Sequence, residues 1–261
     1  MKAIRIHSYG GAEQIQLEDV PVPACGPQDV LVRVVAAGIN PIDWKLRSGA
    51  MAHSFPKSFP ITLGSDAAGI VAAVGGATSA FKLGDEVFCY AEFARGGTYA
   101  EYVAVDATQV ALKPRTMAFA TAAAMPTPAQ AAWTALIETA QLTNGMRVLI
   151  HGAGGALGTV AVQLAHDAGA EVIATASDTA LDLVRSLGAT EVIDYRAQRF
   201  EELVRDVDVV LDAIGGATQE ASWATLRKGG LLVATARPPS TERAAAAAVR
   251  SAFLFTPPRG T

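Results

Sequence analysis

The chain has 261 residues, of which 51% are apolar and 18% charged, and its formal net charge is −4. This composition excludes an intrinsically disordered chain, and the slight acidity argues against nucleic-acid binding, which a basic excess would indicate. The two cysteines, Cys25 and Cys89, are too few for a disulfide framework or a four-cysteine zinc site, so they predict a reduced, cytoplasmic setting. Residues 117–137 carry no charge, but they are mostly alanine and contain prolines, so no membrane span is predicted.

The first part of the chain is predicted to be β-rich. Short β-branched or apolar runs, separated by Gly and Pro, indicate strands at 30–35, 68–75, 84–88 and 100–105. Several short strands with turn signals between them favour a compact, barrel-like β domain over residues 1–115.

From residue 116 onward the pattern alternates between strands and helices. The expected strands are 147–150, 171–174, 191–193, 207–211 and 231–234, and the expected helices are 157–168, 180–187 and 219–226. Gly169 and Gly188 follow two of these helices, where glycine supplies the left-handed cap. The alternation predicts an α/β domain over 116–261 with a parallel sheet.

A Gly-rich turn between the first strand and first helix of this domain is the strongest functional motif. Gly155 and Gly158 stand in the last two positions of a G-x-G-x-x-G pattern, and Ala153 replaces the first glycine. In this context Gly155 lets the backbone approach a pyrophosphate, Gly158 lets helix and strand pack closely, and the helix N-terminus supplies N–H donors. The motif predicts a dinucleotide site formed by Ala153, Gly154, Gly155, Ala156, Leu157 and Gly158.

The residues after the second strand bear on the choice of nucleotide. Ser177 leaves room for a 2′-phosphate, whereas Asp178 would repel a phosphate and hydrogen-bond the ribose of NAD. Asp178 also has a structural interpretation as the N-cap of the next helix. We therefore expect NADPH, with NADH as the less favoured alternative.

Taken together, segments along nearly the whole chain resemble the medium-chain dehydrogenase/reductase superfamily, in its zinc-free quinone oxidoreductase (zeta-crystallin-like) branch. The similar segments are residues 1–4, 9–11, 38–43, 63–71, 81–87, 99–103, 187–189 and 212–216, together with the Gly-rich turn. The resemblance implies a GroES-like N-terminal domain followed by a Rossmann domain with a doubly wound parallel sheet.

The resemblance also bears on metal binding. Zinc-dependent members have Cys where this chain has Asn40, and a His-Glu pair where it has Ser65 and Asp66. Catalytic zinc needs three ligands of the Cys, His or carboxylate type, and none of the four histidines has a spacing that pairs with a cysteine. We expect no metal, and we expect His151 to be a packed or hydrogen-bonded structural residue.

The activity implied by the resemblance is hydride transfer from NADPH to a quinone or to an α,β-unsaturated carbonyl. Asn40 and Asp43 are implied near the nicotinamide as candidate catalytic residues, although Asp43 has an equal alternative role in pinning its loop. Trp44 is expected to pack beneath that loop. The implied cofactor contacts are Ser177 and Tyr195 at the adenosine phosphate and Ile214 and Gly215 at the nicotinamide.

Two departures from the family pattern keep alternatives open. Residues 178–180 lack the basic residue that many relatives have just after the serine, and the chain ends at Thr261 where relatives continue through further strands and helices. The second departure predicts an intact mass above 27.0 kDa or an oligomer, such as a homodimer, that covers the exposed sheet edge. A non-catalytic NADPH-binding sensor or partner subunit of the same fold is the alternative function.

Overall fold

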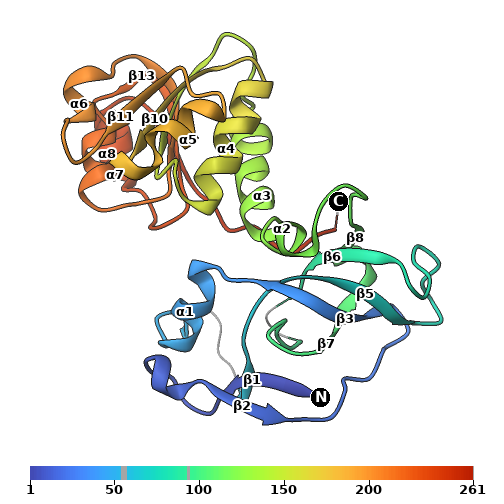
Figure 1. The fold of residues 1–261 in the computed structure, drawn as a ribbon. Coiled ribbons are helices and arrows are strands. Elements are labelled where there is room, and N and C mark those ends of the chain that lie inside the picture. The colour runs from blue at the N-terminus through green and yellow to red at the C-terminus, as the bar shows by residue number, and fades with distance from the viewer. Residues whose placement is uncertain (54–57, 93–94, 261) are drawn as a thin grey trace. The chain divides into compact units, whose positions relative to one another are not determined.

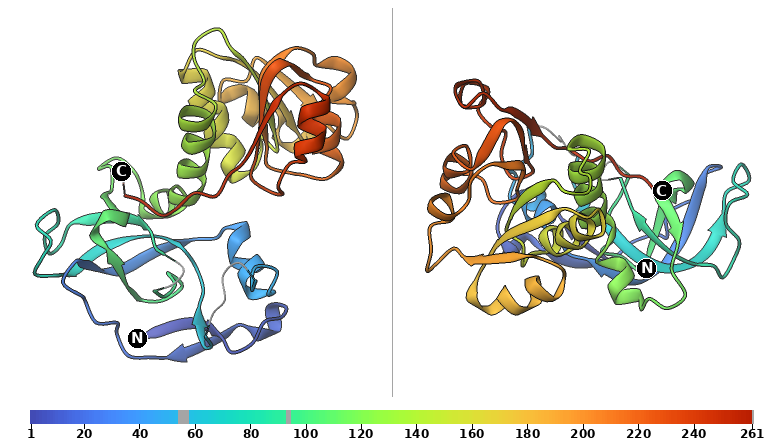
Figure 2. Two further views of the ribbon diagram at one scale, coloured as in Figure 1. Left: turned by 180° about the vertical axis from the view of Figure 1, so that it is seen from behind. Right: turned by 90° about the horizontal axis from the view of Figure 1, so that it is seen from above.

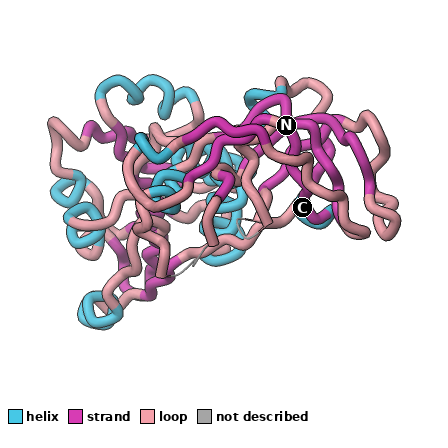
Figure 3. The backbone as a smooth tube through the Cα atoms, turned by 90° about the horizontal axis from the view of Figure 1, so that it is seen from below, coloured by secondary structure: helices cyan, strands magenta, loops and turns pink. Residues whose placement is uncertain are grey.

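The computed structural model describes residues 1–53, 58–92 and 95–260. These residues form two compact units, shown in Figures 1 and 2. The first contains the described residues of Met1–Thr127 and Pro257–Thr261, and the second contains Pro128–Thr256. Figure 3 shows that strands dominate the N-terminal part of the chain, whereas strands and helices alternate in the rest.

The first unit is built from antiparallel strands in two sheets. One sheet has the order β2-β1-β4, and the other has the order β7-β3-β5-β6-β8. Their bounds are β1 Lys2–Ile6, β2 Gln16–Asp19, β3 Asp29–Gly38, β4 Ile61–Thr62, β5 Asp66–Val74, β6 Glu86–Tyr90, β7 Tyr102–Asp106 and β8 Val110–Leu112. Two helices, α1 (Pro41–Arg47) and α2 (Phe119–Ala123), and two short 3-10 turns, Ala12–Gln14 and Ala107–Gln109, complete this unit.

The core of the larger sheet follows the alternation of its strands. Val30 and Val32 on β3 are fully buried, and they pack with Val87 on β6 and Val103 and Val105 on β7. Residues two apart on a strand face the same side, so the β-branched runs read in the sequence become one apolar layer. The β-rich N-terminal domain predicted from the sequence is thereby confirmed.

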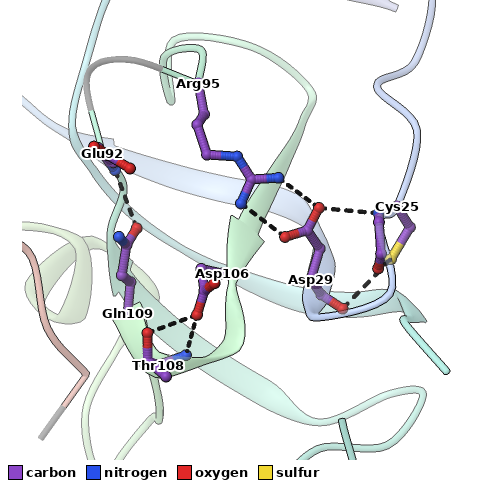
Figure 4. A network of polar contacts seen from close by, with 8 residues as sticks. Cys25, Asp29, Glu92, Arg95, Asp106, Thr108 and Gln109 are labelled. Carbon is purple, nitrogen blue, oxygen red and sulfur yellow. Dashed lines mark hydrogen bonds and ion pairs between the residues drawn. The ribbon is translucent and has the colours of Figure 1, made fainter. Parts of the chain in front are cut away.

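An ion pair fixes the loop that enters β3. The guanidinium of Arg95 donates two hydrogen bonds to the carboxylate of Asp29, at 2.8 and 2.7 Å, as Figure 4 shows. Asp29 also accepts the Gly26 N–H at 2.9 Å, and its side chain is almost fully buried. The Arg95 hydrogen bonds hold the pKa of Asp29 below its usual value. Such bidentate pairs are geometrically specific, so this one anchors the Arg95 segment to the start of β3.

The second unit contains a six-stranded parallel sheet with the order β11-β10-β9-β12-β13-β14. The strands are β9 Arg147–His151, β10 Glu171–Ala176, β11 Glu191–Asp194, β12 Val207–Asp212, β13 Leu226–Ala234 and β14 Arg250–Phe253. The helical segments are α3 Pro126–Trp133, a π-helix Thr134–Thr139, α4 Ala156–Asp167, a 3-10 turn Asp178–Ala180, α5 Leu181–Ser186, α6 Phe200–Leu203, α7 Ala217–Ser222 and α8 Thr241–Ala246. This strand order is that of the Rossmann fold, and the predicted fold class is confirmed.

Each face of the parallel sheet carries its own apolar cluster. One cluster joins Val148 and Ile150 of β9 to α4 and the π-helix, and the other joins Leu149 of β9 to Phe200 of α6 and Trp223. Alternate residues of the same buried strand therefore serve opposite layers, as expected of a parallel sheet covered on both faces.

One predicted helix is placed wrongly. The helix expected over 219–226 lies instead at Ala217–Ser222, and Leu226 opens β13. Leu226 pairs with Val207 in the parallel ladder, and a turn closed by the Thr225 N–H and the Ser222 carbonyl ends the helix. Strand pairing thus outweighs the local helical pattern, which is a tertiary effect.

Within the described ranges, the structure contains no helix that is long and apolar enough to span a membrane. The uncharged stretch that raised the question, 117–137, is divided among α2, α3 and the start of the π-helix.

Candidate functional site

The Gly-rich turn connects β9 to α4 in a tight loop. Gly152 has a φ of +72°, and the loop is closed by hydrogen bonds from Gly155 N–H to the Gly152 carbonyl and from Ala153 N–H to the Thr175 carbonyl, both at 3.0 Å. A Cβ atom at Gly158 would lie 2.5 Å from the Cα of Ala153 and would overlap the Gly152 carbonyl oxygen. The turn therefore requires glycine at position 158 for the helix to start this close to the strand.

The N-terminus of α4 presents uncapped backbone N–H groups. No side chain among the described residues caps it at Gly155, and the helix runs for 12 residues. The N–H groups of a first helical turn have no acceptor within the helix, and the helix dipole adds positive potential there. Gly154, Gly155 and Ala156 are exposed, so a ligand can reach the backbone. The turn fits a pyrophosphate, and it brings together all the residues that the motif predicted, namely Ala153, Gly154, Gly155, Ala156, Leu157 and Gly158.

A second loop, after β12, adjoins this turn. Asp212 is fully buried, and its Oδ1 accepts the N–H groups of Ile214 at 2.9 Å and Gly215 at 2.8 Å. Its Oδ2 accepts a hydrogen bond from the Gln219 amide at 3.0 Å. A Cβ at Gly152 would lie 3.0 Å from Ile214 Cδ1, so the two loops are neighbours at the carboxyl ends of adjacent strands.

Asp212 holds this loop in place, and sequence reasoning did not single it out. Its carboxylate sets the conformation of a loop that holds the half-exposed Ile214 beside the Gly-rich turn. β9 and β12 are also the strands between which the strand order reverses, and ligands of such sheets bind at this switch point. The sequence feature that could have identified Asp212 is an aspartate between an apolar strand and a Gly-Gly pair.

His151 ends β9 in a fully hydrogen-bonded and buried setting. Its Nε2 lies 3.0 Å from Ser222 Oγ and its Nδ1 lies 3.0 Å from Thr175 Oγ1. Ser222 donates its single hydroxyl proton to the Thr218 carbonyl, so its oxygen must accept from His151, and the network assigns the Nε2–H tautomer. Burial lowers the pKa of His151 to about 4. The predicted structural role of His151 is confirmed.

The tips of β10 and β11 carry the residues expected at the adenosine phosphate. Ser177 and Tyr195 follow these strands directly, and the Tyr195 N–H donates to the Ala176 carbonyl at 3.3 Å. Asp178 is not the side-chain cap of the next helix, because it opens a 3-10 turn and its Oδ1 instead accepts a hydrogen bond from Arg196 at 2.9 Å. Arg196 is a basic residue beside Asp178, and sequence reasoning missed it because it lies just after the neighbouring strand β11.

In the first unit, Asn40 and Asp43 lie at the start of α1 and belong to a buried polar network. The Asn40 amide donates from Nδ2 to Asp66 Oδ2 at 2.9 Å. Asp43 Oδ2 accepts the Asn40 backbone N–H and the Tyr99 hydroxyl, both at 2.7 Å. Thr127 donates to Asp66 from its backbone N–H at 2.9 Å and from its hydroxyl at 2.7 Å.

Burial controls the ionisation of both carboxyl groups. It raises the pKa of Asp66 to about 6, against the hydrogen bonds from Thr127 and Asn40 that lower it. It also raises the pKa of Asp43, although the Asn40 and Tyr99 hydrogen bonds oppose the change. Because desolvation disfavours the charged form, Asp66 keeps its proton to a higher pH than an exposed aspartate does.

Positions 40, 65 and 66 are those at which zinc-dependent relatives were expected to carry zinc ligands. In this chain two of them form a hydrogen-bonded pair. Asn40 and Asp66 bond to each other, and Ser65 beside them is fully buried. No group of three or more His, Cys, Asp or Glu side chains in the described part of the chain could hold a metal ion. Trp44 does not pack beneath the loop as predicted: it is 53% exposed, because Asp43 and Leu46 occupy the inward face of α1.

A β-rich unit followed by a dinucleotide-type parallel sheet defines a two-domain nucleotide-binding architecture, and comparisons with known proteins agree. The models for the alcohol dehydrogenase GroES-like domain and for zinc-binding dehydrogenase match residues 26–115 and 156–255. A quinone oxidoreductase of Mus musculus is 37% identical over 89% of this chain and 72% of its own length. The structure of the quinone oxidoreductase from Coxiella burnetii superposes with a TM-score of 0.91 at 32% identity, covering 99% of this chain and 84% of that one.

The chain belongs to the medium-chain dehydrogenase/reductase superfamily, in its quinone oxidoreductase branch. It is also 39% identical to the NADPH-dependent alkenal/one oxidoreductase, chloroplastic, of Arabidopsis thaliana, over 90% of this chain. It spans 62% of the length of that relative.

Proposed function

We propose that the chain is a reductase that transfers a hydride from NADPH to a quinone or an α,β-unsaturated carbonyl without a catalytic zinc. The observation that carries the proposal is the Gly-rich turn, where Gly158 permits close helix–strand packing and the exposed N-terminus of α4 fits a pyrophosphate. The names of the relatives, a quinone oxidoreductase and an NADPH-dependent alkenal/one oxidoreductase, support the acceptor class and the cofactor.

NADPH supplies the hydride, so the protein's work is to bind, orient and exclude water. The backbone of residues 153–158 binds the pyrophosphate. Ile214 and Gly215, held by Asp212, offer an apolar surface to the nicotinamide ring. Ser177 and Tyr195 contact the adenosine phosphate.

Asn40 is the residue that we expect to touch the reacting groups, and Asp66 positions it. Because Asp66 accepts one Nδ2 proton, the amide orientation of Asn40 is fixed. Its second Nδ2 proton is then available to a ribose hydroxyl or the acceptor carbonyl. Asp43 accepts the Asn40 backbone N–H and is a positioning residue in this scheme.

The side chains of this network suit an acceptor that needs no metal. An amide and a hydroxyl at positions 40 and 65 are poor substitutes for thiolate and imidazole ligands. Alcohol oxidation requires stabilisation of an alkoxide, which zinc supplies in related enzymes. Reduction of a quinone or enone proceeds at an already electron-poor carbon.

The test is NADPH consumption by the purified chain with a panel of simple quinones and enones, with and without a zinc chelator. We expect turnover with at least one acceptor and no effect of the chelator. Tight NADPH binding without turnover of any acceptor would refute the reductase and favour a sensor or partner subunit. Asn40→Ala should lower kcat at least tenfold, while Gln198→Ala, on an exposed loop of the second unit, serves as a matched control.

Two further expectations stay predictions. A homodimer would be detected by sedimentation or by light scattering. The cytoplasmic setting rests on cysteine usage, and the Arabidopsis relative is named as chloroplastic. Localisation of a tagged chain in its native cell tests it.

A further inference from the structure

The tips of β10 and β11 place four polar side chains beside one another. Ala176 pairs with Asp194 at the last position of the parallel ladder, so Ser177 and Asp178 leave the sheet next to Tyr195 and Arg196. The Gly-rich turn leaves β9 at the same end of the sheet, because Thr175 pairs with His151 and its carbonyl accepts the N–H of Ala153. A dinucleotide whose pyrophosphate lies on that turn extends its adenosine ribose along this end of the sheet.

Arg196 is held in this group by three contacts. Its guanidinium donates to Asp178 Oδ1 at 2.9 Å, and its Cζ lies 5.7 Å from the centre of the Tyr195 ring. Its backbone N–H donates to Asp194 Oδ1 at 3.0 Å. The side chains of Arg196 and Asp178 are 60% and 61% exposed. A cation is thus oriented at the tip of β11, on a backbone fixed by Asp194.

We propose that Arg196 distinguishes NADPH from NADH by exchanging Asp178 for the 2′-phosphate of the cofactor, an inference that rests on the proposed function. The guanidinium fork binds phosphate through paired, charge-assisted hydrogen bonds. An exposed ion pair such as Arg196–Asp178 contributes little free energy, so the exchange costs little.

The same pair bears on NADH, because Asp178 is the residue that would bind its ribose. By itself its carboxylate would repel a 2′-phosphate and attract a ribose hydroxyl, which favours NADH. Paired with Arg196 it is neutralised and its acceptor oxygen is occupied. The ribose hydroxyls of NADH would have to compete with Arg196 for Asp178, whereas the 2′-phosphate of NADPH binds Arg196 itself.

The test is a fluorescence titration of the full chain with NADPH and NADH. Arg196→Gln should weaken NADPH binding by about 10- to 100-fold, the usual range for losing a charge-assisted contact. It should tighten NADH binding by less than about threefold, because it frees Asp178 from an exposed and therefore weak ion pair. Arg196→Lys should retain part of the preference as a point charge. Asp178→Asn should leave NADPH binding equal or tighter, because it removes the competitor for the guanidinium.

Arg199→Gln is the matched control, since Arg199 is an exposed arginine that pairs with Glu201 and Glu202. An NADPH-to-NADH affinity ratio that is the same in Arg196→Gln and in the unmodified chain would overturn the assignment of Arg196 and leave the proposed function standing. An unmodified chain that binds neither dinucleotide would overturn the proposed function itself. The NADH affinity of each variant reports whether its nucleotide-binding unit is folded.

Discussion

Replacing Asp66 with asparagine should stabilise the protein, and the gain in stability over the unmodified chain should be larger at neutral pH than at acid pH. Asp66 is fully buried, and burial raises its pKa from 3.8 to about 6. Between these two pH values the unfolded chain has already lost the proton that the folded chain keeps. Stability therefore falls as pH rises from about 4 through about 6.

The magnitude follows from the separation of the two pKa values. They differ by about two pH units, and each unit corresponds to about 1.4 kcal/mol, so ionised Asp66 costs about 3 kcal/mol at pH 7. An asparagine can keep all three contacts, since its oxygen accepts from Asn40 and the Thr127 N–H while its amide donates to the Thr127 hydroxyl. The substitution removes the charge and leaves the network intact.

The assay is urea unfolding of both proteins in buffers from about pH 4 to 7.5, followed by circular dichroism. The stability of Asp66→Asn minus that of the unmodified chain should rise by about 3 kcal/mol across this range. Asp106→Asn is the control. Hydrogen bonds from Thr108 lower the pKa of Asp106, so removing its charge should give no gain in stability as pH rises. Parallel stability curves for Asp66→Asn and the unmodified chain would refute the reasoning.

Three other substitutions test separate parts of the structure. Gly158→Ala should destabilise the chain by about 1–3 kcal/mol and weaken NADPH binding at least tenfold, because its Cβ meets turn backbone, whereas Gly76→Ala, with no atom within 4 Å, should change neither. The unmodified chain should lose about 3 kcal/mol of stability as pH falls from 6.5 to about 4, since protonating the buried His151 ring is unfavourable. His151→Gln should remove this loss. Arg95→Gln should cost about 1–3 kcal/mol in urea unfolding because it leaves Asp29 buried without its bidentate partner.

Each of these expectations has a result that would contradict it. Equal NADPH affinities for Gly158→Ala and the unmodified chain would mean that the turn does not bind the pyrophosphate. An unchanged slope of stability between pH 4 and 6.5 in His151→Gln would place that titration elsewhere. Full stability of Arg95→Gln would mean that solvent already hydrates Asp29.

The sequence predicted the nucleotide-binding turn well because every feature of it is local. Strand, turn and helix follow one another within about 20 residues, and Gly155 and Gly158 occupy the spacing that backbone geometry demands. The left-handed caps at Gly169 and Gly188 were predictable for the same reason, with φ values of +78° and +110°. Where a longer-range partner competes, local pattern failed: Leu226 pairs in β13 rather than ending a helix.

The two-part organisation, the family and the turn could be predicted from the residue pattern, since hydrophobic period and Gly spacing act over short distances. Which polar side chains meet depends on contacts between distant parts of the chain. The pairs Asn40–Asp66, Asp66–Thr127 and Asp178–Arg196 join residues 26, 61 and 18 positions apart. Strand pairing and burial bring these groups together and set their ionisation, and neither can be calculated from residue types alone. That is why the pKa of Asp66 is raised and why a cation stands beside Asp178.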